Sequence, residues 1–134
     1  MKENIITSFE IRNTSWGERT LEDIIVQQLT LDRTGCIKHS LFNSLSDLPV
    51  EEHEYNVDTS KMEIFFDFIS SIIQSWETDY RVEVCDGWHW QVNIKYSDNT
   101  FKKVVGTVQS PPNGELLRQH IYDLVDFKVN PWIF

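Results

Sequence analysis

The strongest constraint on the fold of this chain is a two-residue alternation in the segment WHWQVNIKY, residues 88–96. Because successive side chains of a β-strand point to opposite faces, the pattern predicts a strand with one buried face and one solvated face. A strand of this kind is typical of an antiparallel sheet that is covered on one face only. The buried set is Trp88, Trp90, Val92, Ile94 and Tyr96, and the polar set is His89, Gln91, Asn93 and Lys95.

The residues before this strand predict a hairpin with a three-residue turn. A two-residue turn would place apolar residues opposite polar ones, whereas a turn of residues 85–87 keeps the apolar residues of both strands on one face. The longer turn needs Gly87 in the left-handed region, which glycine adopts without steric cost. We therefore expect residues 80–84 to pair with residues 88–96.

This register places Glu83 opposite His89 on the polar face of the predicted sheet. A carboxylate beside an imidazole can orient it as a general base, which makes Glu83 and His89 the candidate catalytic residues. The interpretation that we favour is a half-exposed polar pair on the sheet surface, because cross-strand pairs of this kind are ordinary sheet contacts. Cys85 is a poor candidate nucleophile, since the acidic residues near it would raise the pKa of its thiol.

Four further strands and two helices are predicted from the remaining sequence. The first helix begins with a capping box, in which the side chains of Ser60 and Glu63 each bond to the other residue's backbone amide. The second helix covers residues 113–127, and the apolar segment 130–134 is expected to pack on the core. Residues 43–57 are expected to be irregular. The strands are expected at residues 5–11, 24–31, 36–42 and 101–108.

This order predicts an α+β fold in a single domain, residues 1–134. Its two halves, residues 1–77 and residues 78–134, each have the order βββα and form a candidate pseudo-repeat. We expect a mostly antiparallel six-stranded sheet with both helices packed on one face, because one face of such a sheet must be covered. Two separate three-stranded layers are the alternative.

The net charge of −9 is concentrated in the middle of the chain. Residues 47–86 contain eleven acidic and two basic residues, whereas the segments on either side are nearly neutral. A local negative charge of this size repels nucleic-acid phosphates and attracts cationic partners. We therefore expect no nucleic-acid partner for this region and favour a basic protein surface.

Other classes of protein lack their sequence signals here. No segment is apolar enough to span a bilayer and the amino terminus shows no secretory signal, so we expect a soluble cytoplasmic protein without a membrane partner. Cys36 and Cys85 are expected to be free thiols, with a disulfide between them as the alternative. His53 lies among three glutamates, but consecutive loop residues cannot converge on one ion. With no zinc-ligand spacing and no glycine-rich phosphate loop, neither a metal nor a cofactor is expected.

These observations predict a non-enzymatic protein-binding module whose acidic middle region meets a basic partner. In general type, though without a shared motif, small acidic α+β proteins of this kind resemble bacterial immunity proteins, which neutralise nuclease toxins. Two alternatives remain: a small-molecule or enzymatic site around Glu83 and His89, and a structural module that forms a homodimer through its edge strands and tail. The carboxylates expected to contact a basic partner are those of Glu51, Glu52, Glu54 and Asp58.

Overall fold

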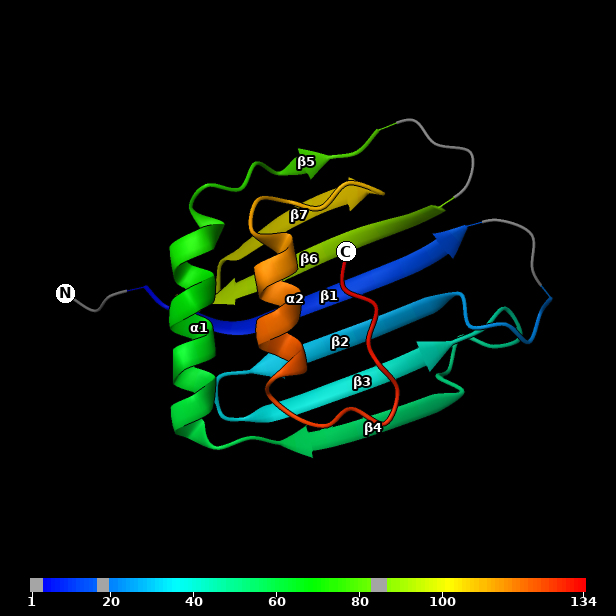
Figure 1. Cartoon of the computed structure of the whole chain (residues 1–134), viewed down its shortest axis with the longest axis horizontal. Helices are drawn as coiled ribbons and strands as arrows, with labels where there is room; N and C mark the ends of the chain where they lie inside the picture. The colour runs from blue at the N-terminus through cyan, green and yellow to red at the C-terminus, as the bar shows by residue number, and fades with distance from the viewer. Residues whose placement is uncertain (1–3, 17–19, 83–86) are drawn as a thin grey trace.

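The computed structural model describes residues 4–16, 20–82 and 87–134, which form a seven-stranded sheet and two helices (Figure 1). This arrangement confirms the α+β class, with four strands and a helix followed by three strands and a helix. The helices are α1 (Thr59–Ile73) and α2 (Gly114–Tyr122). The strands are β1 (Ile6–Trp16), β2 (Val26–Asp32), β3 (Cys36–Phe42), β4 (Glu51–Asn56), β5 (Asp79–Tyr80), β6 (Gly87–Tyr96) and β7 (Phe101–Thr107).

The strands lie side by side in the order β4-β3-β2-β1-β6-β7-β5. Neighbouring strands are antiparallel except for β5 and β7, which are parallel. The first four strands and the last three join through β1 and β6, which pair from Ile6 and Tyr96 to Trp16 and Gly87. The prediction of one mostly antiparallel sheet is therefore confirmed. The expected six strands are corrected to seven in a mixed sheet, and the alternative of two layers is wrong.

The extra strand is β4, in the segment EEHEYN that we expected to be irregular. Glutamate and asparagine are depleted in strands, so the segment carries no propensity signal. Packing stabilises it instead, because the ring of Tyr55 contacts the ring of Phe127 with 5.2 Å between their centroids. β4 is the outermost strand of the sheet, a position where charged side chains are common.

The predicted hairpin between residues 80–84 and residues 88–96 is wrong. β6 is flanked by β1 and β7, which leaves no neighbouring position for another strand. The chain before β6 forms the two-residue strand β5 instead, which runs parallel to β7 beside Val105 and Gly106. Residues 83–86, with most of the expected turn, lie outside the described residues. The expected βββα order of the second half is therefore only roughly matched.

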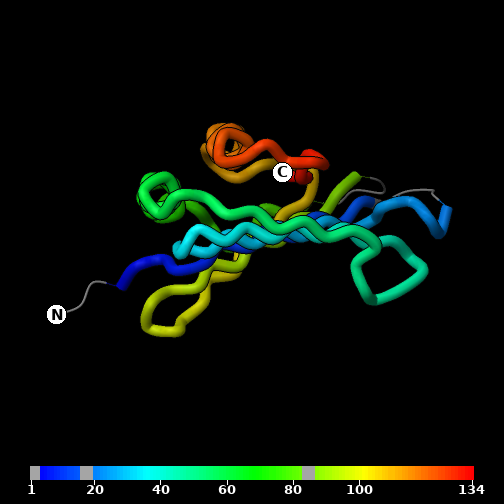
Figure 2. The backbone as a smooth tube through the Cα atoms, turned by 90° about the horizontal axis from the view of Figure 1, so that it is seen from below, coloured from blue at the N-terminus to red at the C-terminus, as the bar shows by residue number. Residues whose placement is uncertain are grey.

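Both helices lie on the same face of the sheet (Figure 2), as the sequence predicts. Trp90, Val92 and Ile94 of β6 are fully buried on this covered face, which confirms the alternation that predicted it. Trp88 belongs to the same face but is 38% exposed, because it lies at the end of the strand. Within the described chain no helix covers the opposite face, which we call the open face.

An ion pair takes the place of the predicted capping box at the start of α1. The helix begins at Thr59, and Asp58 occupies the N-cap position without a side-chain cap hydrogen bond. The predicted exchange between Ser60 and Glu63 is therefore wrong. Glu63 instead accepts a hydrogen bond from the Nη1 of Arg33, at 2.9 Å. A guanidinium competes well for a carboxylate because a hydrogen bond between charged groups is stronger than one to a neutral amide.

The C-terminal segment packs along the covered face, as predicted, and is held there by buried side chains. α2 ends at Tyr122, earlier than expected, and the chain then folds back over the sheet (Figure 1). Asn13 Nδ2 donates to the carbonyl of Trp132 at 2.6 Å, and the amide of Trp132 donates to Gln27 Oε1 at 3.1 Å. The Tyr122 hydroxyl donates to the carbonyl of Pro131 at 3.0 Å. Neither helix in the described residues has the length and apolar character needed to cross a membrane.

Candidate functional site

The first candidate site is the acidic edge, which we define as Glu51, Glu52 and Glu54 of β4 together with Asp58. All four residues are exposed. The structure places three of these predicted contact residues on the outermost strand and the fourth just before α1. Because side chains alternate along a strand, Glu51 lies on the covered face, whereas Glu52 and Glu54 lie on the open face. The acidic edge therefore presents carboxylates on both sides of the sheet.

Lys38 lies beside these carboxylates. Lys38 of β3 points to the open face, and its Nζ lies 3.1 Å from Glu52 Oε1. The hydrogen bond and the charge of Glu52 raise the pKa of Lys38. Within the described part of the chain Glu54 makes no ion pair, although it lies opposite Lys38 in the ladder. Its carboxylate remains available to a partner.

The other acidic residues of segment 47–86 are spread over the molecule. Glu63 bonds to Arg33 on α1's side of the sheet, and Asp79 forms an ion pair with Arg81 at the β5 edge. Glu83 and Asp86 lie outside the described residues. The negative charge that looks continuous in the sequence is therefore divided in space, and β4 carries a compact share of it.

Two histidines adjoin the acidic edge on the covered face. His53 of β4 and His39 of β3 are direct cross-strand neighbours, and His53 Nε2 lies 3.5 Å from Glu51 Oε2. His39 is fully buried. Burial, and next the positive charge of a protonated His53, lower the pKa of His39 to about 4. His39 is therefore neutral at neutral pH and acts as a hydrogen-bonding core residue.

The second candidate site, around Glu83 and His89, is described only on the side of His89. This histidine lies on the open face of β6, where its cross-strand neighbours are Thr14 and Thr107. Burial, followed by the positive charge of Arg81, lowers the pKa of His89. Glu83 lies outside the described residues, so its pairing with His89 stays a prediction.

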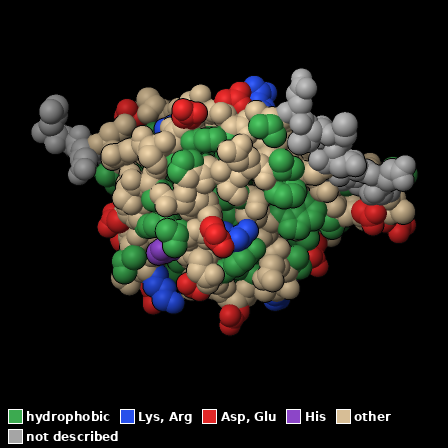
Figure 3. All heavy atoms as spheres, turned by 45° about the horizontal axis from the view of Figure 1, so that its top comes forward, with side chains coloured by type: hydrophobic (Ala, Val, Ile, Leu, Met, Phe, Trp, Pro, Cys, Tyr) green, Lys and Arg blue, Asp and Glu red, His purple; other side chains and the backbone are tan. Residues whose placement is uncertain are grey.

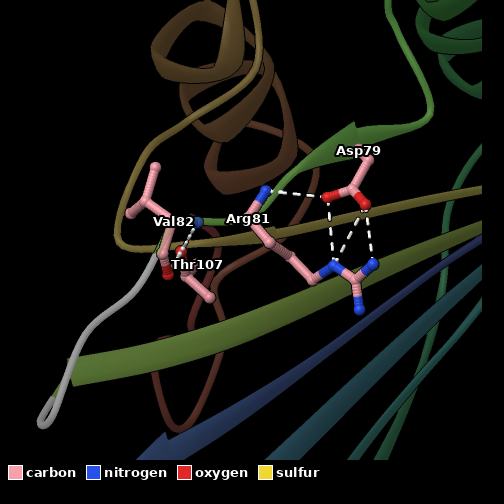
Figure 4. A network of polar contacts seen from close by, with 4 residues as sticks. All are labelled: Asp79, Arg81, Val82 and Thr107. Atoms are coloured by element: carbon pink, nitrogen blue, oxygen red, sulfur yellow. Dashed lines mark hydrogen bonds and ion pairs between the residues drawn. The ribbon is translucent and has the colours of Figure 1, made fainter.

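The edge of the sheet near His89 is closed by contacts of its own residues (Figure 4). Arg81 donates to both carboxylate oxygens of Asp79, with 3.0 Å between Nε and Oδ1 and 2.7 Å between Nη2 and Oδ2. These hydrogen bonds lower the pKa of Asp79 to about 2. Val82 donates its amide to Thr107 Oγ1 at 2.8 Å, and the Thr107 hydroxyl donates back to the Val82 carbonyl at 3.1 Å. These polar groups bond to one another, whereas Glu54 of β4 makes no ion pair within the described part of the chain.

A third candidate site is a cleft of about 570 Å³ at the end of β6. Its lining includes Trp88 of β6, Arg118 and Tyr122 of α2, and Trp132 of the C-terminal segment. Figure 3 shows apolar side chains gathered at the right of the surface in that view. Aromatic rings beside a guanidinium suit a planar aromatic anion. The sequence placed Trp88 on the buried face of the strand and did not predict this cleft, because nothing in the order of the residues places α2 next to Trp88.

No group of three or more His, Cys, Asp or Glu within 4–16, 20–82 and 87–134 could hold a metal ion. Cys36 is an exposed free thiol, and Cys85 lies outside the described residues. Comparison with known proteins gives no matching family model and no significantly similar curated protein.

Proposed function

We propose that this protein is a protein-binding module whose acidic edge binds a basic segment of a partner protein. The observation that carries the proposal is the position of Glu51, Glu52 and Glu54, which are exposed on an outermost strand with carboxylates on both faces. Clustered carboxylates accelerate encounter with a cationic surface and discriminate against nucleic acid. The net charge of −9 likewise favours a cationic partner over nucleic acid.

The test uses a fluorescein-labelled peptide that alternates threonine and lysine, here called the lysine peptide, with binding measured by fluorescence anisotropy. The edge variant replaces Glu51, Glu52 and Glu54 with glutamine. We expect it to bind the lysine peptide at least about tenfold more weakly than the parent, because each lost charge pair contributes a few tenths to one kcal/mol. Binding should also weaken steeply with added salt, since the Debye length falls to about 3 Å at about 1 M.

A matched control separates the acidic edge from net charge. The control variant carries the same three glutamate-to-glutamine changes at exposed residues outside β4, namely Glu22, Glu77 and Glu115. We expect it to bind the lysine peptide within about threefold of the parent, since it leaves β4 unchanged. Equal weakening by both variants would overturn the proposal, because binding would then follow net charge alone. Failure of the parent to bind the lysine peptide would overturn it as well.

A second candidate function is binding of a planar aromatic anion in the cleft beside Trp88. The cleft supports it through the aromatic rings and the guanidinium of Arg118. The probe is anilinonaphthalene sulfonate, whose fluorescence rises on entering an apolar site. We expect Trp88→Ala and Arg118→Gln each to reduce the fluorescence increase, while Leu116→Ala on the exposed side of α2 leaves it unchanged. Equal fluorescence from all of these variants would rule out the cleft.

A further inference from the structure

β4 is an open edge of the described sheet along its whole length. It pairs with β3 along one side and has no strand on the other. At the opposite edge the two-residue strand β5 pairs only with Val105 and Gly106 of β7, and the side chains of Arg81 and Asp79 bond to each other there. An edge strand of six residues presents a row of backbone donors and acceptors that another extended chain can pair with.

The register decides which backbone groups of β4 face outward. The amide of Val57 donates to the carbonyl of Gly35 at 2.8 Å, which makes Asn56 and Cys36 a non-hydrogen-bonded pair. Alternate residues of an antiparallel strand share this state, so the backbone N–H and C=O groups of Glu54 and Glu52 also point away from β3. The outward backbone groups therefore belong to the residues whose side chains lie on the open face.

We propose that β4 binds its partner by strand addition: an extended basic segment pairs antiparallel with β4 and extends the sheet. This inference rests on the proposed function and adds its binding geometry. In a hydrogen-bonded antiparallel pair the two side chains lie on the same face. Each partner residue that exchanges backbone hydrogen bonds with Glu52 or Glu54 therefore places its own side chain beside that carboxylate. A lysine or arginine at every second position of the segment can therefore pair its backbone with Glu52 or Glu54 and place its cationic side chain beside the same carboxylate.

A second copy of this chain fits the edge poorly. An antiparallel register of two β4 strands with Glu54 opposite Asn56 pairs only the ends of the strands. The registers that pair more of each strand through its outward groups place Glu52 opposite Glu54, or place either residue opposite its own copy. Each of these registers brings carboxylates to about 5 Å from one another on the open face, which is destabilising. Charge complementarity therefore selects a basic segment over a homodimer.

The experiment compares three forms of the lysine peptide that have the same charge. The first is unmodified. The second carries a methyl group on the backbone amide nitrogen of each lysine, and the third carries one on the backbone amide nitrogen of each threonine. N-methylation removes the amide donor and adds bulk on that edge of the peptide. We expect the lysine-methylated form to bind at least about tenfold more weakly, because its blocked amides are those that face Glu52 and Glu54. The threonine-methylated form should bind within about threefold of the unmodified peptide, because its methyl groups face solvent.

The outcomes distinguish the binding geometry from the proposed function. Strand addition would be overturned if the parent bound all three peptides equally and the edge variant bound none of them. The acidic edge would then remain the binding surface. Failure of the unmodified peptide to bind would overturn the proposed function itself. Strand addition by a basic segment would also be overturned if the free protein sedimented as a dimer and the edge variant dimerised more tightly than the parent. β4 would then pair with its own copy.

Discussion

His39 donates a hydrogen bond from Nε2 to Gln27 Oε1 across 2.7 Å in the interior of the sheet. The same oxygen accepts the backbone amide of Trp132, so it must act as an acceptor, and the ring proton of His39 must lie on Nε2. Within the described residues the Nδ1 atom of His39 is buried without a hydrogen-bond partner. A proton added to Nδ1 would therefore create a buried charge next to His53.

This arrangement predicts that acid destabilises the fold. The unfolded chain protonates His39 near pH 6.5, whereas the folded chain does so only near pH 4. Between these values the unfolded state holds more protons, so the free energy of unfolding falls as the pH falls. We expect His39 to account for a loss of about 2.5 kcal/mol between about pH 7.5 and about pH 4.5, measured by chemical denaturation.

The variant His39→Leu tests this assignment, because it removes the titrating group from a buried position. Its free energy of unfolding should depend on pH less steeply than that of the parent, whatever its stability at neutral pH. The control Thr30→Val, on the open face of β2, should keep the slope of the parent. A slope in His39→Leu equal to that of the parent would show that another group governs the acid response.

Gly106 predicts a second effect on stability. A Cβ at this position would lie 2.3 Å from ring atoms of Trp90, which is fully buried and donates its Nε1 hydrogen to the Gln109 carbonyl at 2.9 Å. We expect Gly106→Ala to lower the free energy of unfolding by about 2–3 kcal/mol through overpacking. Lys103→Ala, exposed on the same strand, should change it by no more than about 0.5 kcal/mol. Equal stability of the two variants would contradict the packing of Trp90 against β7.

The contacts of Arg33 predict that lysine cannot replace it. Its Nε donates to the Ile6 carbonyl at 2.6 Å, its Nη1 bonds to Glu63, and its Cζ lies 4.9 Å from the ring centroid of Phe66. We expect Arg33→Lys to lower the free energy of unfolding by about 1–2 kcal/mol, since an ammonium cannot make all three contacts. Glu63→Gln should cost about 0.5 kcal/mol, because Glu63 is half-exposed. The prediction would be contradicted if Glu63→Gln lowered the free energy of unfolding by more than Arg33→Lys does.

The alternation in β6 was predicted from the sequence because burial on one face imposes it directly. Trp90, Val92 and Ile94 are buried in the structure as the period requires. The neighbour of that strand could not be predicted in the same way. Local register favoured pairing with residues 80–84, but β1 and β7 occupy both sides of β6 through long-range contacts. Periodicity fixes which face is buried and contains no information on which strand lies alongside.

β4 shows why part of the candidate site was missed. Its glutamates are exposed, but their strand conformation was not expected because glutamate disfavours strands. A weak period of two was present, since His53 and Tyr55 occupy alternate positions in EEHEYN. That signal becomes interpretable only when Phe127, far away in the sequence, packs against Tyr55.

The most direct measurement is amide hydrogen exchange by nuclear magnetic resonance along β4, with and without the lysine peptide. In the free protein we expect slow exchange at His53 and Tyr55, whose amides face β3, and fast exchange at Glu52 and Glu54, whose amides face outward. Addition of the lysine peptide should slow exchange at Glu52 and Glu54. Slow exchange at these two amides in the free protein, or no change when the peptide is bound, would contradict an open β4 edge that receives a basic strand.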